Sequence, residues 1–278
     1  MVFTAAQDAP IRNTGHIKLH TEEHFEGMRR AGRIAAACLD MLVEEVKEGV
    51  TTERIDDLAR EFTLDHGATP ACIFYRGYRH TVCTSINHVV CHGIPSPRAL
   101  RPGDIVNIDV TVILDGWHGD TSRMYAVPPV KRKAMRLMEL TYATLNAGMD
   151  AARAGGNLGD IGAAIQNMVE ADRCSVVRDF CGHGLGRVFH DAPNVLHFGR
   201  QGEGPALRPG MFFTIEPMVN LGKAAVGILP DGWTSVTRDR SLSAQYEHSV
   251  GVTETGLEVF TKSPAGLDAP HKLVAVEG

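Results

Sequence analysis

The sequence predicts an α+β fold built from two related halves, and two observations carry this prediction. Two stretches, Ala99–Asp109 and Ala206–Glu216, spell nearly the same phrase: an Ala-Leu-Arg-Pro-Gly turn and then an apolar strand that ends on a carboxylate. In each half, segments with the apolar spacing of helices stand apart from runs typical of antiparallel strands, as in the α+β class. The repeat is longer than the roughly 20–50 residues of solenoid repeats, so it indicates a duplicated half-domain.

The bulk composition is that of a globular protein with a sizeable core. The 278 residues are 44% hydrophobic and 22% charged. A net charge of −5 gives no support to specific nucleic-acid binding, and no apolar run is long enough for a membrane span. Six cysteines without CxxC spacing argue against a disulfide scaffold or a zinc ribbon and favour the reducing cytoplasm. We expect a monomer, because nothing in the composition demands an oligomer.

The chain is expected to divide into three parts. Residues 1–20 form an arm, 21–260 form a single domain with halves at about 21–127 and 131–260, and 261–278 form a tail. In the first half, Thr21 caps a helix predicted over 25–46 that Gly49 terminates. Thr51 or Thr52 caps a second helix that stops at His66-Gly67.

The first half ends in predicted strands. Short strands are expected at 71–75, 82–86 and 89–91. A longer strand over 105–114 returns over 117–127 through Asp115-Gly116, a strong hairpin signal. This hairpin should bring Asp109 and Asp120 close together, facing each other across the turn. Pro128-Pro129 marks the joint between the halves.

The second half repeats this plan. Helices are predicted over 131–152 and 158–171, followed by a flexible loop at 182–186 and a turn at Pro193. The second phrase contributes a strand, a loop follows around 229–233, and the last strand covers 245–253. We expect the strands of both halves to share one curved sheet with the helices on its outer face.

Acidic side chains and one histidine on these strands form the candidate site. The set comprises Asp109, Asp120, His183, Glu216 and Glu247. A single strand carboxylate is usually solvent-exposed, but several buried together must be paired or bind metal. Four carboxylates balance two divalent cations, and a neutral imidazole adds a ligand without charge. This donor set suits Mn, Fe, Co or Zn.

The histidines are weaker candidates when each is taken alone. His183 lies between glycines that would let the backbone approach a metal pocket, although half of such histidines are surface residues. His92 and His190 lie near strand ends, where a surface or hydrogen-bonded core histidine is the commoner outcome.

Seven motifs in order make the chain resemble the methionine aminopeptidases of the short bacterial type, which have the duplicated "pita-bread" fold. They are Cys91-His92-Gly93-Ile94-Pro95, Asn107-Ile108-Asp109-Val110, Gly119-Asp120-Thr121-Ser122, Gly182-His183-Gly184-Leu185-Gly186, Phe189-His190, Thr214-Ile215-Glu216-Pro217 and Glu247-His248-Ser249-Val250. The resemblance covers about residues 17–260. It implies removal of the N-terminal methionine from nascent proteins, with preference for a small second residue, by attack of metal-activated water on the first peptide bond.

The resemblance also implies a role for each site residue. The five metal ligands fall on the set chosen above by charge, with Asp120 and Glu247 bridging two ions. His92 would contact the scissile amide, His190 the oxyanion, and Glu216 would also transfer protons. The methionine pocket would fall on Cys72, Tyr75, Tyr78, Cys83, Phe189 and Trp233. A monovalent cation would bind near Asn87, Val89 and Ser243, and a transient ribosome contact is a further implied partner.

Three alternatives remain at this stage. A proline-directed peptidase could use the same ligands, but such relatives usually carry a further N-terminal domain, which we do not expect here. A catalytically dead binding module would not require the intact ligand set. A ribosome-binding protein could use Arg29, Arg30 and Arg33 or Lys131, Arg132 and Lys133, although such runs are more often solvated helix faces.

Overall fold

The computed structural model describes residues 1–73 and 75–270. Its first half contains β1 (Phe3–Ala5), β2 (Ile17–Leu19), α1 (Glu22–Met41), α2 (Thr52–Asp65), β3 (Thr69–Pro70), β4 (Val82–Ile86), β5 (Val89–Cys91), β6 (Ile105–Leu114) and β7 (Trp117–Ala126). The second half contains α3 (Arg132–Ala151), α4 (Leu158–Ala171), β8 (Ser175–Val176), β9 (Gly182–Gly184), β10 (Asp191–Val195), β11 (Phe212–Ile215), β12 (Met218–Asn220), β13 (Val226–Ile228), β14 (Ser235–Thr237), β15 (Ser243–Gln245), β16 (Glu247–Val252) and β17 (Leu257–Val259). The predicted α+β class is confirmed.

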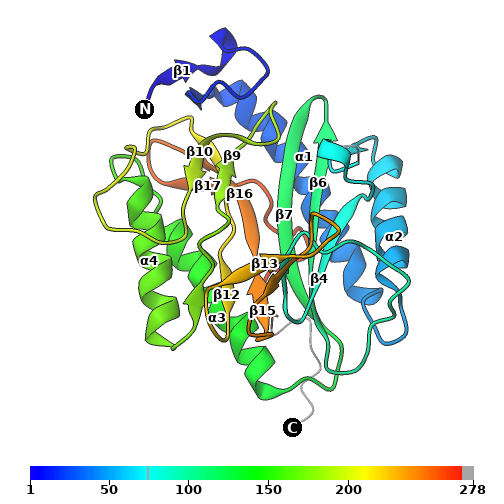
Figure 1. The fold of residues 1–278 in the computed structure, drawn as a ribbon. Helices are drawn as coiled ribbons and strands as arrows, with labels where there is room; N and C mark the ends of the chain where they lie inside the picture. Colours follow the sequence, from blue (N-terminus) through cyan, green and yellow to red (C-terminus); the bar gives the residue numbers. More distant parts are fainter. Residues whose placement is uncertain (74, 271–278) are drawn as a thin grey trace.

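One nine-stranded sheet joins the two halves. Its main path runs β10-β9-β11-β16-β7-β6-β3, with β4 on β6 and β17 on β16. The seam is the pairing of β16 with β7, where Glu247 lies opposite Ser122. Helices α1 and α2 lie behind one half of this sheet, and α3 and α4 behind the other (Figure 1). The expectation of one sheet shared by both halves, with helices on one face, is therefore confirmed.

Each helix pair buries its apolar stripe against its own half of the sheet. Leu39 and Ile55 of α1 and α2 join a cluster with Ile108 of β6. Leu137 of α3 and Ile161 of α4 belong to a second cluster, which includes Phe213, Ile215 and Val250 of the sheet. Burial of apolar surface on both sides of the seam fixes the helices as a rigid support for the strands that carry the site.

Most of the helix boundaries and the hairpin turn predicted from local sequence agree with the structure. Thr51 Oγ1 accepts from the Arg54 amide at the start of α2, and His66 follows its end. The predicted first helix is shorter than expected, since α1 ends at Met41 and a 3₁₀ turn follows. Between β6 and β7, Asp115 and Gly116 have φ of 51° and 82°, the conformation that a two-residue hairpin turn requires.

Several strand predictions were wrong. In 71–75 the described residues form a turn rather than a strand, with residue 74 outside the described part. The predicted strand over 245–253 is broken at Tyr246 into β15 and β16, and β17 follows it. Pro193 lies within strand β10, where its peptide bond to Ala192 is cis, rather than in a turn.

The expected flexible loop at 182–186 was wrong for its first three residues, because Gly182–Gly184 is strand β9, whereas Leu185 and Gly186 lie outside it. A Cβ on Gly182 would lie 2.3 Å from the carbonyl oxygen of Thr214, and one on Gly184 would lie 2.0 Å from that of Ala192. The glycines are therefore required by close packing of β9 against its neighbours rather than by mobility.

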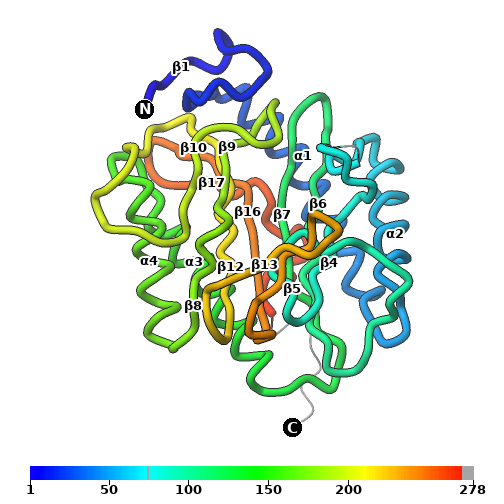
Figure 2. Tube along the Cα trace, in the orientation of Figure 1, coloured from blue at the N-terminus to red at the C-terminus, as the bar shows by residue number. Residues whose placement is uncertain are grey.

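Two small sheets and the chain ends complete the architecture. The order β15-β12-β8 forms one small sheet and β13-β14-β5 another, and the tube view shows these segments around the lower part of the large sheet (Figure 2). Residues 1–20 contain β1, which pairs in parallel with β2. Thr261 binds His248 and Ser249, and Ser263 binds Asp40. The rest of the predicted tail, 271–278, lies outside the described residues. None of the described helices has the length and apolarity that a membrane span requires.

Candidate active site

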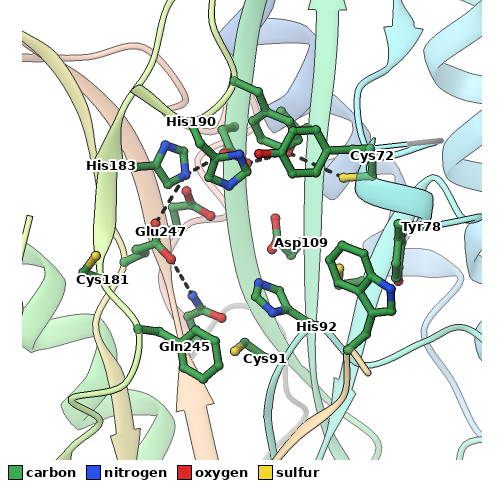
Figure 3. Close-up of a pocket in the computed structure, with 18 of the residues that line it drawn as sticks. Cys72, Tyr78, Cys91, His92, Asp109, Cys181, His183, His190, Gln245 and Glu247 are labelled. Atoms are coloured by element: carbon green, nitrogen blue, oxygen red, sulfur yellow. Dashed lines mark hydrogen bonds and ion pairs between the residues drawn. The ribbon is translucent and has the colours of Figure 1, made fainter. Parts of the chain in front are cut away.

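A cavity of about 360 Å³ lies where β6, β7, β9 and β16 meet, and it brings together the predicted metal-ligand, histidine and methionine-pocket residues, but not those of the predicted monovalent-cation site. These are Cys72, Tyr75, Tyr78, Cys83, His92, Asp109, Asp120, His183, Phe189, His190, Glu216, Trp233 and Glu247. Figure 3 shows Asp109 in the middle of this cavity, with His183 and His190 above it in this view and His92 below. Residues from both halves of the chain therefore build one site.

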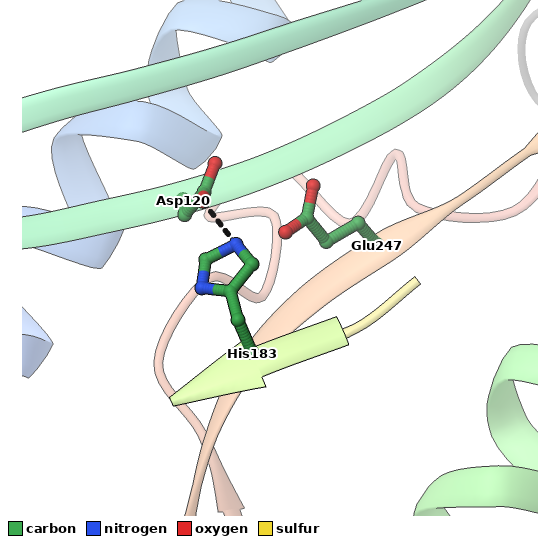
Figure 4. A group of neighbouring side chains, drawn as sticks. All are labelled: Asp120, His183 and Glu247. Carbon is green, nitrogen blue, oxygen red and sulfur yellow. Dashed lines mark ion pairs between the residues drawn. The ribbon is translucent and has the colours of Figure 1, made fainter. Parts of the chain in front are cut away.

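Asp120, His183 and Glu247 form the tightest group in the cavity. One donor atom from each lies within 4.8 Å of the others (Figure 4). Asp120 and Glu247 are 3% and 2% exposed. They come from β7 and β16, the two strands that pair at the seam, so the sheet itself sets their separation.

Asp109 and Glu216 extend this group on two sides. Asp109 lies in the middle of β6 rather than at its end, and it pairs with Ser122, while Thr111 pairs with Asp120. The expectation that Asp109 and Asp120 face each other was thus wrong. Asp120 lies opposite Thr111, which is two residues from Asp109 on the same face of β6. Glu216 follows the end of β11, and Thr214 Oγ1 donates to its Oε1 at 2.7 Å.

His183 presents a lone pair to the carboxylates. Its Nδ1 lies 3.1 Å from the carbonyl oxygen of Gly184, which can only accept a hydrogen bond, so Nδ1 carries the proton. Nε2 lies 3.5 Å from Asp120 Oδ2 and 3.7 Å from Glu216 Oε1. His183 Nε2, Asp120 Oδ2 and Glu216 Oε1 are therefore three hydrogen-bond acceptors close together, and a cation between them would relieve their mutual repulsion. This is the arrangement that a metal-ligating histidine adopts.

The pKa directions reflect the same lack of a compensating charge. Burial, followed by repulsion among the carboxylates, holds the pKa of Asp109 and that of Glu247 well above the usual range. Burial raises the pKa of Asp120 to about 7, and it raises the pKa of Glu216 well above its usual range. Burial lowers the pKa of His183 to about 4, so its ring is neutral. Oxygen ligands with one neutral imidazole fit a hard-to-borderline divalent cation.

His190 and His92 flank this cluster as neutral rings. Burial lowers the pKa of His190 to about 2, and its ring centroid lies 4.2 Å from that of His183. Burial also lowers the pKa of His92, which makes edge contacts with Phe180 and Trp233. A neutral imidazole can donate one hydrogen bond without adding charge, which suits contact with a polar reacting group.

The wall of the cavity opposite the acids is soft and aromatic. Tyr78 makes an edge contact with Trp233 at 5.0 Å between ring centroids, and Tyr75 lies 4.9 Å from Phe189. Burial raises the pKa of the Cys72 and Cys83 thiols well above the usual value, so both are neutral. Neutral sulfur and aromatic rings are favourable neighbours for a thioether.

Sequence reasoning missed several residues of this site. The further lining residues are Arg76, Cys91, Thr111, Asp179, Phe180, Cys181, Met218 and Gln245. Thr111 donates to Asp120 Oδ1 at 2.6 Å and Gln245 Nε2 donates to Glu216 Oε2 at 3.2 Å. The alternation along a strand could have found Thr111, which shares a face with Asp109. His197, whose Nε2 accepts from the Glu216 amide at 3.1 Å, lies too far along the chain for such a signal.

Comparisons with known proteins agree with this geometry. Residues 26–254 match the model of metallopeptidase family M24. The methionine aminopeptidase of Rickettsia prowazekii is 55% identical over 255 residues, covering 91% of this chain and 98% of that protein. That of Escherichia coli K12 is 50% identical over 247 residues, covering 88% of this chain and 94% of that protein.

Solved structures place the chain in the same group. The crystal structure of the Rickettsia prowazekii enzyme superposes with a TM-score of 0.87 and covers 88% of this chain and 99% of that one. A prolidase from Pyrococcus furiosus, at 20% identity and a TM-score of 0.70, shares the fold, and the match covers only 65% of that chain. The chain therefore belongs to metallopeptidase family M24 and, within it, to the methionine aminopeptidases of the bacterial type.

Proposed function

We propose that the chain removes the N-terminal methionine from nascent proteins and peptides and prefers a small second residue. The observation that carries this proposal is the juxtaposition of the buried acids and the His183 Nε2 lone pair with a soft, aromatic wall in one cavity. The identity of 50–55% to methionine aminopeptidases over most of the chain supports the same reaction. As a metallopeptidase, the chain uses divalent metal ions.

Two ions per chain are proposed, held by Asp109, Asp120, His183, Glu216 and Glu247. Two divalent charges match the four carboxylates, whose raised pKa values reflect uncompensated burial. The ligand types admit Co, Mn, Fe(II) or Zn. When bound, the ions would supply Lewis-acid activation of the attacking water and of the peptide carbonyl.

The protein side chains around the metal site transfer protons, donate hydrogen bonds and bind the substrate. Glu216 accepts a proton from the attacking water and passes it to the leaving amine. His190 donates a hydrogen bond to the oxyanion, and His92 contacts the scissile amide. Cys72, Tyr75, Tyr78, Cys83, Phe189 and Trp233 hold the methionine side chain; their shared softness and aromaticity support this assignment.

A monovalent cation is proposed near Asn87, Val89 and Ser243. These residues adjoin one another, since the Ser243 amide donates to the Asn87 carbonyl at 2.8 Å. Within the described part of the chain, the buried Ser243 Oγ has no hydrogen-bond partner. An unpaired buried oxygen beside main-chain carbonyls supports a cation at this place.

The enzyme is further proposed to act as a monomer in the cytoplasm, with a transient ribosome contact. The proposed site needs no residue from a second chain, and we assign it to a single catalytic domain over 21–260. The six cysteines are free thiols, which supports a reducing compartment. A basic segment at the start of α3, with Lys131, Arg132 and Lys133, could contact ribosomal RNA.

The test is release of free methionine by chelator-stripped protein to which Mn, Fe(II), Co or Zn is returned separately under anaerobic conditions. We expect cleavage of Met-Gly-Met-Met and none of Ala-Gly-Met-Met, and only after metal is added. A peptide with Pro in the second position and a first residue other than Met tests the proline-directed alternative. Activity on neither tetrapeptide, with metal demonstrably bound, would overturn the proposal.

A further inference from the structure

Arg76 has an unusual position at the edge of the catalytic cavity. Among the described residues that line the cavity, it is the sole lysine or arginine. Arg76 is exposed, and within the described part of the chain it forms no salt bridge with a carboxylate. An exposed guanidinium without an anionic partner, beside a substrate cavity, is free to bind an anionic group of a ligand.

The charges around it favour that use. The acids in the cavity are Asp109, Asp120, Asp179, Glu216 and Glu247, and all except Asp179 belong to the proposed metal cluster. Once the metal ions offset those four acids, the exposed side chains of Arg76 and Asp179 remain as opposite charges in the lining. Arg76 is therefore the one cationic side chain among the described lining residues, and the proposed hydrolytic chemistry does not use it.

The backbone holds Arg76 in a conformation that arginine rarely adopts. Its φ and ψ are 48° and 30°, within the left-handed region, inside the short 3₁₀ turn Tyr75–Gly77. Non-glycine residues in this region cost about 1–2 kcal/mol, and they cluster at ligand-binding sites. The turn thus fixes the direction in which the Cα–Cβ bond of Arg76 leaves the backbone, at an energetic cost.

Contacts connect the guanidinium to the reaction centre. Its Cζ lies 5.4 Å from the centroid of the Tyr75 ring. Tyr75 stacks on His190, with ring centroids 5.0 Å apart. The positive charge therefore lies close to the place where the scissile bond would bind.

We propose that Arg76 is a specificity-determining residue, which forms an ion pair with an acidic side chain at the third residue of the substrate. This inference rests on the proposed function. The methionine would fill the aromatic pocket and the small second residue would pass the metal cluster. The third residue is then the first whose side chain can be long enough to reach the edge of the cavity. Arginine suits this role because its planar fork can bind a carboxylate through two hydrogen bonds.

The experiment compares kcat/KM for Met-Gly-Glu-Met, Met-Gly-Gln-Met and Met-Gly-Lys-Met. The measured quantity is the ratio of the Glu peptide to the Lys peptide, with the Gln peptide as the neutral isostere. Exposed ion pairs are weak, so Arg76→Ala should lower this ratio about two- to five-fold, mainly through the Glu peptide. Arg76→Glu should lower it further, and Arg76→Lys should keep most of it.

Arg187→Ala is the matched control. Arg187 is also exposed, and its substitution by alanine removes the same charge, but it lies by Trp117 and does not line this cavity. An equal shift in the Arg187 and Arg76 variants, or an unchanged ratio in Arg76→Ala, would overturn the inference. Cleavage of Met-Gly-Met-Met is measured in parallel. If the wild type cleaves this peptide but Arg76→Ala leaves the Glu-to-Lys ratio unchanged, only the role proposed for Arg76 is refuted. If the wild type does not cleave it, the proposed function itself is refuted.

Discussion

The ammonium of Lys18 lies 2.7 Å from Oδ2 of Asp191, and the two side chains are only 9% and 4% exposed. Lys18 belongs to β2, next to the start of α1, and Asp191 is the residue after His190. The Lys18 ammonium also donates to the Arg12 carbonyl, and the Asn13 amide donates to the His190 carbonyl at 3.1 Å. The first twenty residues are thereby joined to the strand that follows a proposed catalytic histidine.

Lys18→Met should lower the free energy of unfolding by about 3–5 kcal/mol, because it leaves Asp191 as an unpaired buried charge. The double variant Lys18→Met/Asp191→Asn should recover more than half of that loss, since the remaining amide carries no charge. Arg60→Met, which breaks an exposed pair with Asp57, serves as the control and should cost less than about 1 kcal/mol. Denaturant unfolding measures all three, and a loss below about 1 kcal/mol for Lys18→Met would show that the buried pair is not stabilising.

His20→Phe should make stability less sensitive to acid. The His20 ring stacks on Phe212 with centroids 4.0 Å apart, and burial lowers its pKa to about 3 from 6.5. Below pH 6.5 the unfolded chain binds a proton there that the folded protein does not, so stability is lost as pH falls. This one group contributes a slope approaching about 1.4 kcal/mol per pH unit between pH 6.5 and the folded pKa.

The measurement is chemical unfolding of the wild type and the variant at several values between pH 4 and 7. In the phenylalanine variant, the free energy of unfolding should change less steeply with pH, by the slope that corresponds to about one bound proton. This difference in slope is expected whatever the absolute stability of the variant. His16→Ala, at an exposed position, should leave the slope unchanged. Parallel curves for wild type and His20→Phe would mean that His20 is protonated in the folded protein.

Glu216→Gln should reduce kcat by about 10²–10⁴, the range for loss of a general acid–base group. The amide retains the hydrogen bond from Thr214 but can neither accept the proton nor carry the charge of a metal ligand. Turnover of Met-Gly-Met-Met and metal content by atomic absorption are measured together. Near wild-type turnover at any metal content would exclude the assigned role. Asp239→Asn, at an exposed acid that does not line the cavity, is the control and should leave both quantities unchanged.

Much of the fold could be predicted because its signals are local. The β6–β7 hairpin follows from an alternating run and an Asp-Gly turn whose conformations few other residues adopt. Strand β9 could not, because only the approach of Thr214 and Ala192 reveals why its glycines are extended rather than mobile. The sequence around Gly182 and Gly184 favours a flexible loop, but tertiary packing holds both glycines in a strand.

The site divides in the same way. Charge balance and motif order were enough to predict that the acids and His183 form one site, because both can be read directly from the sequence. The offset of Asp109 from Asp120 could not be read, because strand register depends on where pairing begins. His197 was equally inaccessible: it supports the Glu216 backbone from a separate loop, and a lone histidine gives no sign of such a contact.

His190→Ala should lower kcat by about 10²–10³ while metal content stays at the wild-type level. The ring lies beside His183 but belongs to the segment before β10, and its buried Nδ1 has no hydrogen-bond partner in the described part of the chain. A donor that contacts only the oxyanion contributes in the transition state, so KM should change much less than kcat. His183→Ala is the matched comparison and should lose metal as well as activity. If His190→Ala instead strips the metal ions, His190 is a ligand, and the division between ligands and hydrogen-bond donors proposed for this cavity is wrong.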